Sequence, residues 1–169
     1  MSARIRKAFP AEVAALADIA FLAWDKDLRP LLSGAAADRQ TEQRRLGREV
    51  QAGLDRIILA EIDGAAVGWC SRARGRSYIP YLFVTPLLQN LGIGTLLLMR
   101  MESMLELEGF GRVQLDTLAD NVRAVSFYQR QGYRIMALPP EERRGRSPET
   151  GVRLEKQLSP WRGPVGGAD

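Results

Sequence analysis

The chain has 169 residues, 46% of them apolar and 26% charged, which is the size and composition of one globular domain. It contains no histidine and a single cysteine, which excludes Ser-His-Asp and Cys-His catalysis, histidine-ligated metals and intrachain disulfides. The formal net charge is +4, and its scattered arginines fit either a solvated surface or an anionic ligand.

Hydrophobic periodicity divides the chain into short strands and helices. In chain order we expect strand 3–9, helix 10–24, a loop or irregular helix over 25–38, helix 39–53, strands 56–62, 65–73 and 78–84, helix 92–108, strand 112–118, helix 121–131, and strands 133–139 and 152–158. Asp63–Gly64 predicts a hairpin turn. Because hairpins and crossover helices are mixed, the sequence predicts a single α/β (α+β) domain, with a mixed central sheet of about seven strands and helices on both faces.

The ends of the chain carry weaker signals. We expect the domain to cover residues 1–158, and the tail 159–169 to be flexible or held only by Trp161. The first residues lack the apolar stretch of a signal peptide, and no run of eighteen apolar residues occurs, so we expect a cytoplasmic protein with no membrane partner. Cys70 is interpreted as a small buried hydrophobe, because no histidine is available to activate it as a nucleophile.

Two glycines, Gly92 and Gly94, open the predicted helix 92–108, although glycine costs about 1 kcal/mol relative to alanine inside a helix. The first turn of a helix has unpaired N–H groups and a partial positive charge, so the stretch from Gln89 to Gly94 predicts a cradle for a diphosphate. Gly92 would let a phosphate touch the backbone, and Gly94 would let the helix pack close to its strand. The lysine of a Walker A loop is missing, and Leu97 stands at the third glycine of a dinucleotide fingerprint.

The stretches FVTPLLQNLGIGTLLL and NVRAVSFYQRQGY, with the strand VQLDTL between them, resemble the GNAT superfamily of N-acetyltransferases. The resemblance rests on VxPxxQxxGxG followed about thirty residues later by NxxAxxFYxxxGY, and weaker agreement spans residues 3–158. It implies a GNAT-like domain in which two parallel strands, here 79–85 and 113–118, splay apart to form a cleft for acetyl-CoA.

The same resemblance implies a binding site for the acyl donor. A bulge would leave backbone groups of Leu82, Phe83 and Val84 unpaired, and the pantetheine arm would bond to them as a neighbouring strand does. Asn121 matches an asparagine that bonds this arm, a role compatible with capping its helix. The pyrophosphate would rest on the backbone amides of Gln89, Asn90, Leu91, Gly92, Ile93 and Gly94.

Tyr128 matches the tyrosine that faces the thioester sulfur in this family, and Phe127 beside it is expected in the core. A phenol with a pKa of about 10 can protonate a departing thiolate with a pKa of about 8.5, so the resemblance implies that Tyr128 is the general acid. A backbone N–H near Val84 would stabilise the oxyanion. The alternative for Tyr128 is a plain wall of the pocket.

The general base is the point where the sequence departs from the family pattern. Many members carry a glutamate on the strand before the glutamine motif, and the ungapped equivalent here is Tyr78. Pro80 on the same strand removes a backbone donor and suggests an edge or a bulge. The alternatives left open are water relayed by Tyr78, Tyr81 or Glu61, and Asp116 on the partner strand, whose side chain can point to either face.

The acceptor site would lie in the segments 24–33 and 139–151, where solvated loop charge is the alternative interpretation. Trp24, Asp25 and Asp27 would suit a cationic amine, whereas Arg143, Arg144 and Arg146 would suit an anionic one.

The predicted function is transfer of an acetyl group from acetyl-CoA, as acyl-donor substrate and without a metal, to a primary amine of a small molecule or protein by direct attack. The alternatives are a catalytically weak acyl-CoA-binding sensor or structural module, and acetylation of aminoacyl-tRNA. The second of these needs a coherent basic face that the sequence does not show, so nucleic acid is not an expected partner. Dimers are common in the family, but no residue here locates an interface.

Overall fold

The computed structural model describes residues 2–137, 151–161 and 163. In chain order, the described strands and main helices are β1 (Arg4–Lys7), α1 (Val13–Asp27), α2 (Arg39–Gly53), β2 (Ile57–Ile62), β3 (Ala65–Ser71), β4 (Tyr81–Val84), α3 (Ile93–Leu107), β5 (Arg112–Leu118), α4 (Val122–Arg130), β6 (Arg134–Met136) and β7 (Gly151–Gln157). Short 3-10 turns precede α1 and α3, link α1 to α2, and follow α2.

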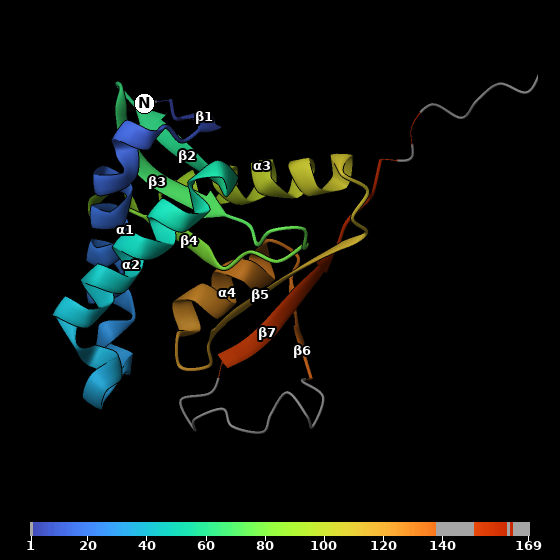
Figure 1. Cartoon of the computed structure of the whole chain (residues 1–169). Coiled ribbons are helices and arrows are strands. Elements are labelled where there is room, and N and C mark those ends of the chain that lie inside the picture. Colours follow the sequence, from blue (N-terminus) through green and yellow to red (C-terminus); the bar gives the residue numbers. More distant parts are fainter. Residues whose placement is uncertain (1, 138–150, 162, 164–169) are drawn as a thin grey trace, which may run out of the picture.

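The seven described strands form two antiparallel sheets that meet at one point (Figure 1). One sheet has the order β1-β2-β3-β4 and the other the order β5-β7-β6. They meet at a parallel bridge between Tyr78 and Gln114, where the Ile79 N–H donates to the Gln114 carbonyl at 2.9 Å. Beyond this bridge β4 and β5 diverge, which confirms the predicted mixed sheet with a splayed strand pair.

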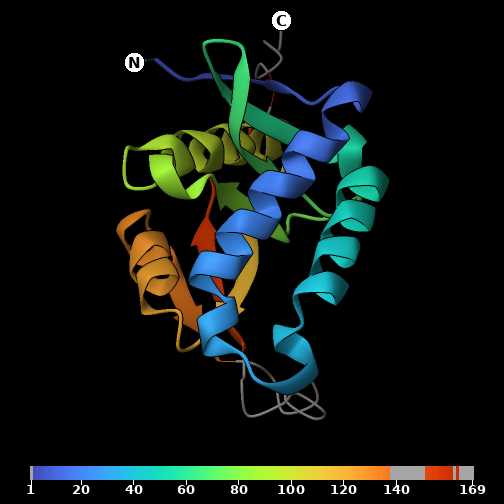
Figure 2. The same ribbon diagram turned by 90° about the vertical axis from the view of Figure 1, so that its left-hand side faces the viewer.

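Helices cover both faces of the sheets, as predicted (Figures 1 and 2). Helices α1 and α2 pack over β2 and β3 on one face around Leu16, Leu46 and Trp69, which are almost fully buried. Helix α3 packs on the other face, where Leu97 and Met101 join a second core that runs into the β5-β7-β6 sheet. The two cores sandwich the sheet and fix the positions of the strand ends at which α3 and α4 begin.

Most element boundaries agree with the sequence prediction, because turn and cap residues mark them. Helix α2 occupies 39–53 as predicted, with the Asp38 carboxylate accepting the Thr41 N–H at 2.7 Å, and Asp63 and Gly64 form the hairpin turn with positive φ angles. Two predictions were wrong in detail. Asp25–Asp27 belong to the last turn of α1, and the strand expected over 78–84 keeps regular pairing only from Tyr81 because Pro80 has no N–H.

Beyond β7 the chain returns to α3. The backbone N–H of Trp161 donates to the Glu106 carbonyl at 2.9 Å, and the N–H of Ser159 donates to the Glu106 carboxylate at 3.1 Å. Among the described residues 2–137, 151–161 and 163, no helix is both long enough and apolar enough to cross a bilayer.

Gly68 on β3 sets how closely β4 can approach, and the sequence analysis did not single it out. A Cβ at this position would lie 2.8 Å from the Phe83 carbonyl oxygen, 3.3 Å from Cα of Val84 and 3.3 Å from Cδ1 of Leu97. Two of these three atoms belong to the backbone of β4, so the strand itself would have to move.

We therefore expect Gly68→Ala to destabilise the fold by roughly 1–3 kcal/mol, the usual cost of overpacking a core. For a chain of this size that lowers the melting temperature by about 2–10 °C. Thermal unfolding followed by circular dichroism measures the change. Gly47→Ala in α2 is the control, because a Cβ there has no atom within 4 Å and the backbone is helical. A Gly68→Ala protein as stable as the wild type would contradict the close approach of β3 and β4.

Candidate active site

A cleft of about 870 Å³ lies along β4, bounded by α1, the loop before α3, and α4. Nine of the eleven predicted site residues line it: Leu82, Phe83, Val84, Gln89, Asn90, Gly92, Gly94, Asn121 and Tyr128. Its volume falls within the range typical of small-molecule sites. Residues predicted from separate motifs, up to 46 positions apart in the sequence (82 to 128), therefore share one cavity.

The edge of β4 that faces the cleft presents backbone groups of alternate residues. The Thr85 N–H donates to the Val67 carbonyl of β3 at 2.8 Å, and antiparallel pairing directs every second residue the same way. Phe83 therefore pairs with β3, while Leu82 and Val84 direct their N–H and C=O groups toward the cleft. The prediction that all three residues offer backbone bonds was wrong for Phe83, whose ring instead stacks on Tyr81 with centroids 5.9 Å apart.

The predicted bulge was also wrong in its place. β4 pairs with β3 without a register shift, whereas a shift occurs between β2 and β3 at Ala60 and Glu61. The backbone groups of β4 face the cleft because β5 diverges from it, and because β4 is the edge strand of its sheet in the described part of the chain.

The loop from Gln89 to Gly94 turns the chain sharply into α3. Asn90 has φ 63° and Gly92, the residue just before the helix, has φ 85°, so two left-handed residues direct the loop amides into the start of the helix. Around Gly92 a Cβ would meet no atom within 4 Å, which agrees with a backbone left accessible to a ligand. Leu91 and Ile93 are not among the residues that line the cleft: the Leu91 side chain is 60% exposed, and the Ile93 side chain is buried.

Gly94 lines the cleft, but the packing role predicted for it was wrong. A Cβ at Gly94 would lie 3.5 Å from the Phe127 ring and 3.8 Å from Cγ2 of Val84, which is ordinary van der Waals contact. The helix would therefore keep its distance from β4 with alanine at this position.

The Gln89 side chain ties the loop to α1 and to β4. Its amide nitrogen donates to Asp27 at 2.7 Å and to the Val84 carbonyl at 3.3 Å, and its amide oxygen accepts a hydrogen bond from Lys26 at 2.8 Å. Asp27 also pairs with Arg123 of α4 at 3.5 Å. These contacts hold the loop amides in place and link α1 to α4 across the cleft.

Helix α4 begins at the mouth of the cleft and carries Tyr128 on its inner side. The Asn121 side chain caps it by accepting the Ala124 N–H at 3.2 Å, which confirms the predicted cap. The Tyr128 ring contacts Phe127 and Tyr133 edge-on, with centroids 5.1 and 5.5 Å apart. Burial, followed by the nearby Cys70 and Tyr78, raises the pKa of Tyr128 above its usual value, so the phenol keeps its proton at neutral pH.

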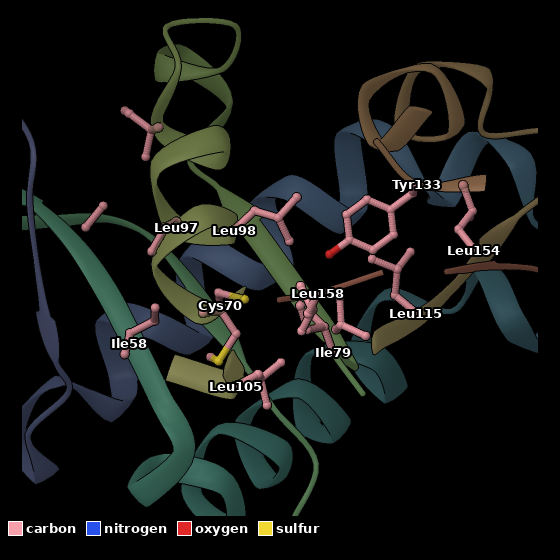
Figure 3. Close-up of a cluster of buried hydrophobic side chains, with 14 of the residues drawn as sticks. Ile58, Cys70, Ile79, Leu97, Leu98, Leu105, Leu115, Tyr133, Leu154 and Leu158 are labelled. Carbon is pink, nitrogen blue, oxygen red and sulfur yellow. The ribbon is translucent and has the colours of Figure 1, made fainter. Parts of the chain in front are cut away.

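Cys70 lies beneath α3 near Leu97, Leu98 and Leu105 (Figure 3). Its side chain is fully buried, and burial raises the pKa of its thiol above the usual value. The thiolate, which is the nucleophilic form, is therefore rarer than in a free cysteine. This supports the interpretation of Cys70 as a core residue.

The four candidates for the general base lie in different surroundings. Glu61 pairs with Arg6 at 2.6 Å, and the Tyr81 hydroxyl accepts a hydrogen bond from Arg45 at 2.8 Å. Tyr78 and Asp116 contact each other, with the Tyr78 hydroxyl donating to Asp116 at 3.2 Å. The structure thus brings together two of the four candidates beside the bridge between Tyr78 and Gln114 of β5.

Residues 16–133, about 70% of the chain, match the sequence model of the Acetyltransferase (GNAT) family. The chain belongs to this GNAT family. Two uncharacterized proteins of Bacillus subtilis (strain 168) are similar to part of it. YdhI is 39% identical over 87 residues, which cover 52% of this chain and 54% of YdhI, and YxbD is 39% identical over 82 residues, which cover 48% and 52%. The chain spans about half the length of the curated relatives it matches.

Solved structures resemble this GNAT chain over nearly its whole length. The PaiA N-acetyltransferase from Thermoplasma acidophilum in complex with coenzyme A has a TM-score of 0.70 at 19% identity, covering 94% of this chain and 100% of that one. The ribosomal-protein-S18-alanine N-acetyltransferase from Escherichia coli has a TM-score of 0.67 at 14% identity, covering 97% and 99%. At these identities the likeness shows that the fold is shared.

Several cleft residues of this GNAT chain were missed by the sequence analysis. Lys26, Thr95, Arg123, Ser126 and Arg130 all line the cavity. The only signal for Arg123 and Arg130 was their place on the helix that carries the second GNAT motif, and Lys26 had none. Three of the five are cations, which gives the cleft the positive charge that an anionic ligand requires.

The residues predicted for the acceptor site are only partly available. Trp24 is buried at 3% exposure in the core beneath α1, so it cannot contact an acceptor. Asp25 pairs with Arg29 at 2.6 Å and with Arg39 at 3.5 Å, and Asp27 holds Gln89. Arg143, Arg144 and Arg146 lie outside the described residues.

Proposed function

We propose that this protein is an acyl-CoA-dependent N-acetyltransferase, which moves an acetyl group from acetyl-CoA to a primary amine by direct attack. One observation carries the proposal. One cleft is lined by the loop Gln89–Gly94 that leads into α3, by the edge of β4 that faces away from β3, and by Tyr128. These are an anion cradle, a main-chain partner and an acid, in the order in which a diphosphate, an amide-containing arm and a thioester follow one another in acetyl-CoA.

The binding part of the proposal uses main-chain chemistry. The amides of residues 89–94 and the dipole of α3 favour a diphosphate at that end of the cleft, with Lys26 and Arg123 nearby. The backbone groups of Leu82 and the N–H of Val84 would pair with the amides of the pantetheine arm. The coenzyme A in the structure of the similar PaiA N-acetyltransferase supports this ligand class.

The chemical part assigns Tyr128 as the general acid. When the amine attacks the acetyl carbonyl, negative charge develops first on the carbonyl oxygen and then on the sulfur. A backbone N–H on the open edge of β4 can stabilise the oxygen, and the protonated Tyr128 can give its proton to the departing thiolate. No histidine or accessible cysteine is available to carry an acyl intermediate, so direct attack is the simplest route.

A thermal melt tests the binding step. Acetyl-CoA at about 100 times its Kd should add roughly 2.7 kcal/mol to the free energy of unfolding, which raises the melting temperature by about 5–10 °C. NAD and ATP at the same concentration are the controls, and a larger shift with either would contradict the proposed ligand. Turnover is then measured as CoA release with a panel of primary amines. Binding of acetyl-CoA without turnover of any amine would favour an acyl-CoA sensor over an enzyme.

A further inference from the structure

A second cavity, of about 220 Å³, lies between the C-terminal half of α2 and the strands β3 and β4. We call it the α2 cavity. Its lining includes Trp69 and Ile57, which are almost fully buried, and Glu49 of α2, which is exposed and marks the side open to solvent. None of the described residues lines both this cavity and the cleft: on β4, Tyr81 lines the first and Leu82 the second.

Two polar atoms in the lining of the α2 cavity are buried without a hydrogen-bond partner. They are Oγ of Ser71 and Nε of Arg56, and in the described part of the chain these are the two buried side-chain nitrogen or oxygen atoms that lack one. The Ser71 residue is only 5% exposed. Folded proteins pair most buried polar atoms, because an unpaired one loses its hydration without replacement. The presence of both atoms in one cavity lining is what a site for a polar ligand requires.

The pairing of β2 with β3 places these two residues close together. Ser71 lies opposite Ile57, so both side chains leave the sheet on the face that α1 and α2 cover. Arg56 directly precedes Ile57, and its carbonyl accepts the Arg72 N–H at 3.3 Å. The two unpartnered atoms therefore come from adjacent positions, where β2 begins and β3 ends.

The rest of the Arg56 guanidinium is held by other contacts. Its Nη1 donates to the Asp55 carboxylate at 2.7 Å, and its Nη2 donates to the Ala52 carbonyl at 3.3 Å. These contacts orient the planar group and leave its Nε–H as a donor. Because the Ser71 hydroxyl can also donate, a ligand with two neighbouring acceptor oxygens would satisfy both groups.

The charges around the α2 cavity select the class of ligand. The guanidinium of Arg56 favours an anion, and its partner Asp55 has a side chain 59% exposed, so water screens that charge. Arg72, also in the lining, is paired with Glu108. Glu49 is the one acid in the described lining, and it would repel a second negative charge on the ligand. A singly charged carboxylate meets these conditions, since its planar pair of oxygens suits a guanidinium edge.

We propose that the α2 cavity binds a small monocarboxylate, whose oxygens accept hydrogen bonds from Nε of Arg56 and the hydroxyl of Ser71. Its apolar part lies against Trp69 and Tyr81, whose rings meet edge-on with centroids 5.9 Å apart. The indole N–H of Trp69 is already bonded to the Leu16 carbonyl at 2.8 Å, so the ring offers apolar surface.

The size of the α2 cavity limits the length of this ligand. Sites for drug-sized molecules typically measure about 300–1,000 Å³, so a cavity of about 220 Å³ suits a carboxylate with a short aliphatic chain. Water is the competing occupant, because several molecules of about 30 Å³ each fit the same space. The two differ in one respect: only a carboxylate stabilises the fold in proportion to its own concentration.

The experiment measures the melting temperature while sodium propionate replaces sodium chloride at constant ionic strength. We expect a saturable rise, of about 3–6 °C when propionate is at about ten times its Kd. Sodium malonate and sodium sulfate are the comparison salts. They should give no saturable rise, because each would bring a second negative charge toward Glu49.

Two variants remove the proposed donors one at a time. Ser71→Ala deletes the hydroxyl, and Arg56→Lys keeps the positive charge but deletes Nε–H. Each should weaken propionate binding about tenfold or more, the loss expected for a hydrogen bond to a charged group.

The matched controls make the same substitutions outside the described lining of the α2 cavity. Ser103→Ala changes a serine of α3 whose hydroxyl donates to the Met99 carbonyl at 3.0 Å. Arg74→Lys changes an arginine that also pairs with Asp55, at 3.3 Å. Both controls should bind propionate as the wild type does.

Three results would overturn the inference. The first is no saturable rise with propionate, or an equal rise with sulfate, which would leave water as the occupant. The second is wild-type propionate affinity in Ser71→Ala, which alone decides if Arg56→Lys fails to fold. The third is a propionate effect that acetyl-CoA abolishes, which would place the anion in the cleft. The proposed acetyl transfer stands under all three, because the two linings are separate.

Discussion

Gly92→Glu is expected to weaken acetyl-CoA binding at least a hundredfold while the fold survives. Gly92 precedes α3 with φ 85°, and a side chain built there meets open space in the cleft. A carboxylate on that side chain would lie beside the proposed diphosphate. At 4 Å and an effective dielectric of 20, two like charges repel by about 4 kcal/mol, and each 1.4 kcal/mol is tenfold in affinity.

The control for Gly92→Glu separates charge from backbone strain. Any L residue at this φ pays about 1–2 kcal/mol for the left-handed conformation. Gly92→Ala carries the same strain without the charge, so it should lower the melting temperature similarly and keep most of the acetyl-CoA affinity. Isothermal titration of both variants gives the comparison. Normal acetyl-CoA affinity in Gly92→Glu would mean that the diphosphate binds elsewhere.

Tyr128→Phe is expected to lower kcat by about a hundredfold with little change in the affinity for acetyl-CoA. The substitution removes the proposed acid and keeps the ring that contacts Phe127 and Tyr133. Positioned general acids typically contribute 10²–10⁴ in rate, so the loss should fall on the chemical step. Single-turnover rates and a binding titration measure the two quantities separately.

The pH dependence sharpens this prediction. Because burial raises the pKa of Tyr128 above its usual value of about 10, the phenol should remain protonated at neutral and moderately alkaline pH. Wild-type kcat should therefore show no decline from loss of this proton below pH 10. Tyr133→Phe is the control, because it removes a neighbouring phenol that donates to Glu102 at 2.9 Å and lies outside the cleft lining. Equal losses of kcat in the two variants would assign the effect to packing.

The sequence predicted those parts of the site that depend on local chemistry. An asparagine that caps a helix and a proline that interrupts a strand act within a few residues of themselves. The Asn121 cap and the interruption at Pro80 were therefore interpreted correctly, whereas the phosphate contact of Gly92 stays a prediction.

Other parts of the site depend on pairings that one sequence does not state. The register between β3 and β4 decides whether Phe83 or its two neighbours direct their backbone groups toward the cleft. The face from which Asp116 projects follows from its register with Arg153 on β7. Gln89 meets Lys26 and Asp27 from more than sixty residues away, a contact that only the packing of α1 over the cleft creates.

In the part of the chain that the structure describes, the two sheets share one backbone bridge, between Tyr78 and Gln114, and this has a consequence for the proposed reaction cycle. A donor lying between β4 and β5 would supply hydrogen bonds of the kind that a strand there would make, so the substrate would also serve as a temporary part of the sheet. The protein would be more rigid with the donor bound, and the contact between the two sheets would become more mobile each time CoA departs. Departure of the spent donor would then be an opening of the fold as well as a dissociation, and it can limit the rate of turnover.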